Sequence, residues 1–161
     1  MAFSLTLIAA AAIAMPLQQA KTPPLPRPMP LLNLRDGSGK MWNRPAFTDK
    51  VVLIEFWATW CASCKKMRPT LNELRKTYAD RGFETLFVSI DQDKKALDRY
   101  LAGKPFDGPV VHATDGRWSE WDVTSVPAMF LVRDGQIVAQ WTGETPKAKL
   151  DEAILKALAP R

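Results

Sequence analysis

The sequence contains few cysteine and histidine residues, the usual ligands of zinc, with two cysteines and one histidine among 161 residues. A structural zinc site needs about four ligands, so these three residues do not complete one. The net charge of +5 is modest, and no basic run is interleaved with aromatic residues. We therefore expect neither a resident metal nor nucleic-acid binding. An internal repeat is also lacking, so the chain is not expected to be a solenoid.

Charged side chains are missing from the first twenty residues, and residues 3–15 form an apolar stretch rich in alanine. Such a stretch is typical of an export signal. We expect residues 1–20 to be a signal peptide or, alternatively, an uncleaved N-terminal anchor. Residues 21–30 contain five prolines and are expected to form an extended linker. The folded part is then a single domain over residues 31–161.

Apolar periodicity predicts strands that alternate with helices in this domain. An Asp-Gly pair at Asp134-Gly135 indicates a hairpin between the last two strands. The predicted elements are an N-terminal hairpin around residues 35–39, strands over 51–57, 85–90, 110–111, 128–132 and 136–141, and helices over 62–80, 96–101 and 146–158. This order predicts an α/β fold, a three-layer α/β/α sandwich with a mixed central sheet and a helix-strand insertion.

Cys61 and Cys64 lie where the first buried strand turns into a helix, the place where such folds position their chemistry. Two cysteines at this spacing close a small disulfide ring with little backbone movement. A thiol at a helix start also meets unpaired N–H groups and the positive end of the helix dipole, which favour the thiolate. The placement predicts a redox pair. A permanent disulfide and half of a zinc site are the alternatives.

The motif Trp-Cys-Ala-Ser-Cys at residues 60–64, with Pro69 five positions after the second cysteine, resembles the active site of the thioredoxin-fold family. Val126-Pro127 resembles the cis-proline loop of that family, and Gly143 resembles its glycine before the last helix. The export-like start, the early hairpin and the extra helix-strand segment are similar to the exported TlpA/ResA/CcmG branch. Its members are thiol:disulfide oxidoreductases.

The resemblance implies a role for each residue of the site. Cys61 is expected to be the nucleophile and Cys64 the resolving thiol, and the cycle leaves a disulfide between them. Glu55 matches the buried acid of the family, and burial is expected to raise its pKa so that it accepts the proton of Cys64. The alternative is an exposed or water-satisfied glutamate. Phe87 stands where the family commonly has a lysine, so we expect the pKa of Glu55 to rise further.

Trp60 on one side and Val126 with Pro127 on the other are expected to form the substrate groove. Core packing is the alternative for Trp60 and is the preferred interpretation for Trp57. Besides Phe87, the sequence differs from the family pattern at Met67, which stands where ResA-like members have an acid. Behaviour that depends on that acid is not expected to transfer.

The sequence thus predicts an exported thiol:disulfide oxidoreductase, periplasmic or otherwise extracytoplasmic. No histidine lies between the cysteines, which favours a reductant over a strong oxidant. The expected setting is cytochrome c maturation or metal-centre assembly. Its expected partners are protein thiols and disulfides and a membrane electron donor of the thiol-reducing type. We expect a monomer without a cofactor, soluble or tethered by its N-terminal segment.

Two other functions use the same thiols. A copper-binding or metal-delivery protein would add His112 to the two cysteines, but such proteins usually have three residues between the cysteines. A peroxidase of related fold would need a single peroxidatic cysteine in another local setting. The spacing of Cys61 and Cys64 favours thiol-disulfide exchange over both.

Overall fold

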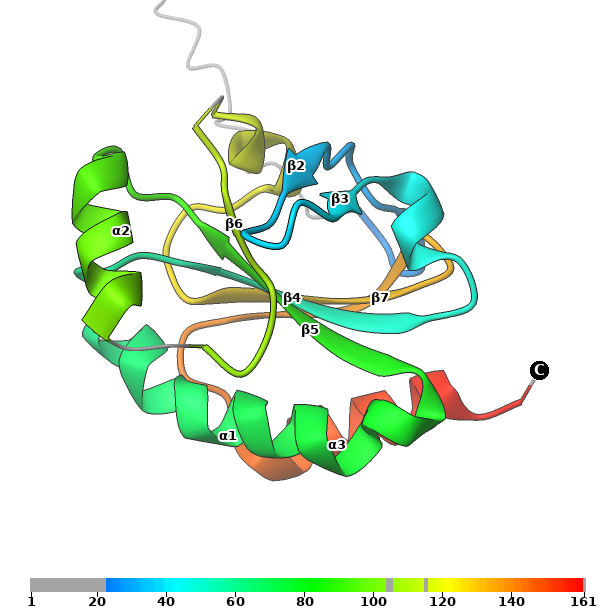
Figure 1. Ribbon diagram of the computed structural model, residues 1–161. Coiled ribbons are helices and arrows are strands. Elements are labelled where there is room, and N and C mark those ends of the chain that lie inside the picture. The colour runs from blue at the N-terminus through cyan, green and yellow to red at the C-terminus, as the bar shows by residue number, and fades with distance from the viewer. Residues whose placement is uncertain (1–22, 104–105, 115, 161) are drawn as a thin grey trace, which may run out of the picture.

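A six-stranded mixed sheet forms the centre of the molecule in the computed structural model, which describes residues 23–103, 106–114 and 116–160 (Figure 1). The strand order is β1-β8-β7-β4-β5-β6, with β4, β5 and β6 parallel and the other neighbours antiparallel. The strands are β1 (Arg27–Pro28), β4 (Val51–Trp57), β5 (Phe83–Ser89), β6 (Val110–His112), β7 (Ala128–Arg133) and β8 (Gln136–Thr142). A separate hairpin pairs β2 (Leu34–Arg35) with β3 (Met41–Trp42).

Strand β4 lies in the middle of the sheet, and all seven of its residues are buried. It pairs with β5 in parallel and with β7 in antiparallel orientation, so its backbone groups are used on both sides. The predicted buried strand is confirmed. The predicted hairpin between β7 and β8 is confirmed as well, because Asp134 and Gly135 both have positive φ, 50° and 74°, as a type I′ turn requires.

The helices are α1 (Ala62–Tyr78), α2 (Lys94–Gly103) and α3 (Lys147–Leu158). Helix α1 directly follows the loop after β4 and buries one face, and α3 packs into the same core cluster. Figure 1 shows α1 and α3 side by side beneath the sheet, with α2 at its edge. Leu97 of α2 belongs to this cluster too, so all three α-helices contribute to one core.

The opposite face of the sheet is covered by the β2-β3 hairpin and the short 3-10 helices η1 (Arg44–Phe47) and η3 (Arg117–Trp121). The predicted α/β sandwich is confirmed, with a hairpin and 3-10 turns in place of α-helices in this layer. Left-handed residues, Gly116 at φ 71° and Asp122 at φ 57°, bracket η3 and stop it from extending.

The ordered fold starts before residue 31, the expected domain boundary. Arg27 and Pro28 pair with β8, the N–H of Met29 donates to the carbonyl of Gly135 at 3.0 Å, and Met29 is buried. The prolines of this segment had suggested a linker, yet proline is tolerated in an edge strand, where one side of the ladder is unpaired. The linker expected over residues 21–30 is therefore wrong for its last part.

The signal peptide or anchor expected at residues 1–20 lies outside the described residues. Within the described ranges, no helix has the length and apolar character needed to cross a membrane.

Candidate active site

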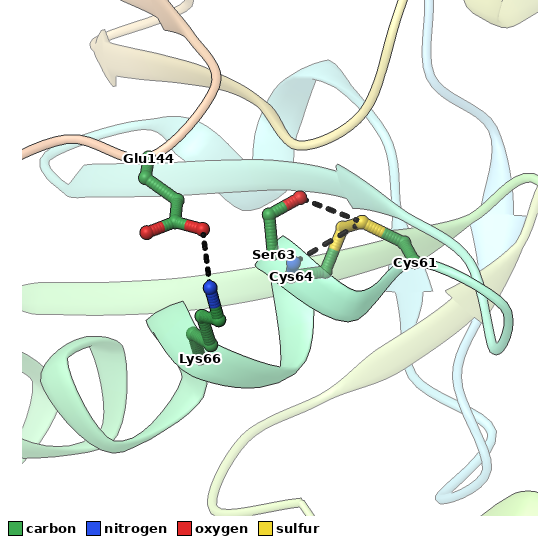
Figure 2. Close-up of polar contacts among 5 residues, drawn as sticks. All are labelled: Cys61, Ser63, Cys64, Lys66 and Glu144. Carbon is green, nitrogen blue, oxygen red and sulfur yellow. Dashed lines mark hydrogen bonds and ion pairs between the residues drawn. A yellow bond between two sulfur atoms is a disulfide. The ribbon is translucent and has the colours of Figure 1, made fainter.

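Cys61 and Cys64 form a disulfide at the N-terminus of α1, with their Cα atoms 5.4 Å apart (Figure 2). Cys61 is the N-cap residue of α1, and its sulfur accepts a hydrogen bond from the backbone N–H of Cys64 at 3.1 Å. The hydroxyl of Ser63 lies 3.5 Å from the same sulfur. A sulfur that receives a free N–H at a helix start is favoured as a thiolate once the pair is reduced.

The surroundings of the two sulfurs differ in exposure. Cys61 is 5% exposed, Cys64 is completely buried, and the neighbouring Trp60 is 68% exposed. Core packing is therefore the wrong interpretation for Trp60. It is confirmed for Trp57, which is fully buried and contacts the rings of Tyr100 and Phe106. A large exposed aromatic side chain thus lies beside the more accessible sulfur.

Glu55 faces the core on the helical side of the sheet. Side chains alternate along a strand, and the alternate neighbours Leu53 and Trp57 belong to the cluster that contains Cys64. Glu55 is 1% exposed, and neither carboxyl oxygen has a hydrogen-bond donor among the described residues. Burial raises the pKa of Glu55 to about 8, and the positive charge of Arg68 partly opposes this rise. The predicted burial is confirmed, and the exposed alternative is wrong.

Arg68 is a residue of the site that the sequence interpretation missed. Phe87 of β5 pairs with Glu55 of β4. This neutral side chain occupies the position where the family commonly has a lysine, as expected. A counter-charge is nevertheless supplied from α1 by Arg68, four residues after Cys64. A cation on the otherwise apolar face of a helix, one turn after a redox cysteine, was the signal in the sequence that pointed to it.

Asp91 is a second missed residue, located just after β5. It is 4% exposed, and its carboxylate accepts hydrogen bonds from the backbone N–H and hydroxyl of Thr59 and from the hydroxyl of Ser89. Thr59 lies two positions before Cys61. Asp91 therefore holds the loop before Cys61 against the end of β5 through these hydrogen bonds.

The loop of Val126 and Pro127 comes to the same end of the sheet as the disulfide. Strand β7 begins at Ala128, opposite Phe56 near the end of β4, so the residues before Ala128 extend beyond that end. The peptide bond between Val126 and Pro127 is cis, as the resemblance implied. The carbonyl of Pro127 accepts a hydrogen bond from Gly143 at 2.8 Å, which ties this loop to the segment before α3.

Two lysines follow the disulfide on α1, and one of them pairs with an acid. Lys66 Nζ lies 3.3 Å from Glu144 Oε1, and Figure 2 shows this pair beside the two cysteines. Both side chains are largely exposed, so the pair is worth about 1 kcal/mol or less. Lys65 Nζ lies over the ring of Tyr100, 5.4 Å from the ring centre. Met67, by contrast, is buried in the core.

His112 lies on β6 and is engaged away from the disulfide. Its Nε2 is 2.6 Å from the carbonyl oxygen of Asp91. Over residues 23–103, 106–114 and 116–160, no three histidine, cysteine or acidic side chains are grouped so that they could hold a metal ion. No contact therefore supports the metal-delivery alternative.

Comparisons with known proteins agree with this geometry. The family model described as thioredoxin-like matches residues 49–138. Thiol-disulfide oxidoreductase ResA of Bacillus thuringiensis is 31% identical over 127 residues, which cover 78% of this chain and 73% of that protein. A crystal structure of a putative thiol:disulfide interchange protein DsbE from Chlorobium tepidum superposes with a TM-score of 0.77 at 28% identity, covering 83% of this chain and 97% of the other.

Proposed function

The chain belongs to the thioredoxin-like family and is a thiol-disulfide oxidoreductase, and we propose that it reduces disulfides of protein substrates with Cys61 and Cys64. The observation that carries this proposal is the disulfide at the N-terminus of α1, in which Cys61 keeps 5% exposure and Cys64 is completely buried. The oxidised pair is the product that a reductant leaves behind, so a second reaction must reduce it again.

The proposed cycle starts from the two thiols. The thiolate of Cys61 attacks a substrate disulfide, a mixed disulfide forms, and the first substrate sulfur leaves as a thiolate. The thiolate of Cys64 then attacks the sulfur of Cys61, the mixed disulfide breaks, and the second substrate sulfur leaves. Two electrons pass to the substrate, and its two thiolates take up protons according to their pKa. The order of attack follows from exposure, because Cys64 is fully buried.

Glu55 is proposed as the acceptor of the Cys64 proton. It faces the same core cluster as Cys64, and its pKa of about 8 leaves about a tenth of it ionised at pH 7. An acid with a pKa near the working pH exchanges protons in both directions at low cost. Transfer to Glu55, directly or through water, generates the Cys64 thiolate inside the core, where a thiol alone would resist ionisation.

The proposed substrate groove lies between Trp60 and the loop of Val126 and Pro127. Trp60 offers an exposed apolar surface beside Cys61, and proline removes a backbone donor from the facing loop. An extended substrate segment pairs with the backbone of Val126 in this proposal, which places its disulfide over Cys61.

We propose that the protein works outside the cytoplasm, re-reduced by a membrane electron donor of the thiol-reducing type. The uncharged apolar start supports export, and the absence of histidine between the cysteines supports a reducing role. Reduction of substrate disulfides to thiols in cytochrome c maturation or metal-centre assembly fits such a protein, because these cysteines must be kept as thiols in an oxidising compartment.

Equilibration of the full chain with mixtures of reduced and oxidised glutathione tests the proposal. A reduction potential near or below about −270 mV supports a reductant, and one near about −120 mV overturns this direction. A Cys64→Ser variant is the matched control, since it forms mixed disulfides without closing the ring. If the wild-type pair does not exchange with glutathione or with a protein disulfide at all, the function itself is wrong.

A further inference from the structure

Arg68 extends from α1 into an aromatic enclosure next to the redox pair. Its guanidinium carbon lies 3.3 Å from the ring centre of Phe106, 4.8 Å from that of Trp57 and 5.6 Å from that of Phe87. The hydroxyl of Tyr100 is hydrogen-bonded to it. Aromatic faces attract a cation and hold a planar guanidinium in place, so this charge is fixed in position.

Nε and Nη2 of Arg68 are buried without a hydrogen-bond acceptor among the described residues. Buried donors that lack an acceptor destabilise the folded protein, because they lose their hydrogen bonds to water without replacement. An arginine whose only role was packing would not be expected to carry this cost. A negative charge nearby would compensate it.

Glu55 is the acidic side chain of the core whose charge interacts with this cation. Phe87 is paired with Glu55 across β4 and β5 and also lies against Arg68, so one ring borders both charges. Burial raises the pKa of Glu55 and lowers the pKa of Arg68, and the charge of each group partly opposes the shift of the other. No donor among the described residues bonds to the carboxyl oxygens, so this influence acts through the low-dielectric core.

The other groups around Glu55 leave Arg68 as its source of positive charge. Phe87 of β5 and Met129 of β7, its two partners in the sheet, are neutral. The titratable groups in the core cluster on this face are Cys61 at the N-cap of α1, Cys64 and Tyr78 of α1, and Tyr100 of α2. None of them carries a positive charge in any protonation state.

We propose that Arg68 is a positioning residue for proton transfer, whose fixed charge keeps a working fraction of Glu55 ionised and thereby sets the rate at which Cys64 is deprotonated. Arg68 follows Cys64 by four residues on α1, so the helix that carries the resolving thiol also carries the charge that tunes its base. The inference rests on the proposed function, since it concerns the resolving step of that cycle.

Loss of the Arg68 charge should shift the pH dependence of mixed-disulfide resolution by Cys64. Removal of the cation leaves the effect of burial unopposed, so the pKa of Glu55 rises above its wild-type value. An opposite charge typically shifts a carboxyl pKa by about one unit or more. The ionised fraction at pH 7 then falls about tenfold, and resolution of the mixed disulfide by Cys64 slows by the same factor. The midpoint of the pH-rate profile moves to higher pH by about one unit.

The test compares Arg68→Met, Arg68→Gln and Arg68→Lys in the full chain. The pH-rate profile of mixed-disulfide resolution is measured, and the carboxyl of Glu55 is titrated by infrared difference against Glu55→Gln. Methionine and glutamine differ in packing but remove the same charge, so both should shift the profile and the carboxyl titration upward by about one unit. Lysine keeps the charge and should restore most of the wild-type profile.

Arg75→Met is the matched control, because it removes an arginine from the same helix face two turns further on, where Arg75 pairs with Glu84 instead. It should leave both midpoints unchanged. Wild-type midpoints in Arg68→Met and Arg68→Gln would overturn the inference, and so would an equal shift in Arg75→Met. The carboxyl titration requires no substrate. If the wild-type protein fails to exchange disulfides, the proposed function fails separately from this result.

Discussion

Glu55 and Asp91 are both buried acids, at 1% and 4% exposure, but their surroundings are opposite. Asp91 receives hydrogen bonds from the backbone N–H and hydroxyl of Thr59 and from the hydroxyl of Ser89. Glu55 receives none among the described residues. A buried carboxylate is tolerated when it is hydrogen-bonded, whereas one without partners shifts its pKa and takes up a proton.

Position along the strands explains this difference. Asp91 lies beyond the end of β5, where the loop before Cys61 still has a free N–H to donate. Glu55 lies in the middle of β4, where the backbone N–H groups are used by the sheet neighbours β5 and β7. One carboxyl group therefore stabilises the loop, and the other is available for proton transfer.

Replacement of Asp91 by alanine should have the largest effect on stability, because it leaves the donors of Thr59 and Ser89 without their acceptor. The expected loss is about 4 kcal/mol in the free energy of unfolding, measured by urea denaturation. Asp98→Ala, which removes an exposed acid paired with Lys94, is the control and should cost less than about 0.5 kcal/mol. Equal losses in the two variants would contradict the role of Asp91.

Replacement of Glu55 by glutamine should instead stabilise the protein, and only at high pH. Below pH 4.5 the carboxyl is neutral in both states. As the pH rises to about 8 the unfolded chain ionises first, so Glu55 progressively lowers stability, and the loss is complete above that pH. We expect the free energy of unfolding of Glu55→Gln to exceed that of wild type by about 5 kcal/mol at pH 9 and by little at pH 4, measured by urea denaturation of the oxidised protein.

Glu144→Gln is the control for this pH dependence, because Glu144 is an exposed acid near α1. Its stability should follow wild type at both pH values. If the free energy of unfolding of Glu55→Gln differed from that of wild type by the same amount at pH 4 and pH 9, Glu55 would have the same pKa in the folded and unfolded protein, which contradicts the account.

The same Glu55→Gln substitution should slow catalysis at one step. Resolution of the mixed disulfide by Cys64 is expected to fall about 100-fold at pH 7, the lower end of what a general base contributes. Attack by Cys61 on the substrate should be unchanged, so the mixed disulfide accumulates and is detected by mass spectrometry after an acid quench. Resolution at the wild-type rate would remove Glu55 from the mechanism.

Trp60→Ala should have the smallest effect. It should weaken substrate binding and leave proton transfer through Glu55 unchanged. Trp60 is 68% exposed, so the free energy of unfolding should change by less than about 0.5 kcal/mol. KM for a protein disulfide should rise about fivefold, equivalent to about 1 kcal/mol, while kcat stays constant. Leu155→Ala, an exposed apolar residue on α3, is the control and should leave KM unchanged.

The sequence was sufficient to predict most of the fold, because the patterns involved are local. The continuous apolar run of β4, the helical spacing after Cys61 and the Asp134-Gly135 turn each predict one element by themselves. Strand β1 was missed because its pairing with β8 joins residues more than a hundred positions apart. Its prolines also hid it, since they argue against strands in general and are tolerated at edges.

The site was predicted unevenly for a similar reason. Cys61, Cys64 and the burial of Glu55 follow from a motif and from the strand that contains it. Arg68 and Asp91 act across elements, on Glu55 and on Thr59, and their positions in the sequence do not show which residue each one acts on. Residues that tune a site through space are therefore the part that needed a three-dimensional structure.

The central claim is that burial holds Glu55 largely protonated at neutral pH, ready to exchange a proton with Cys64. Titration of the side-chain carboxyl by carbon-13 NMR in the oxidised wild-type protein, assigned with Glu55→Gln, tests it most directly. We expect a midpoint of about 8. A midpoint near the ordinary value of 4.5 would contradict the account, because Glu55 would then be ionised throughout the working range.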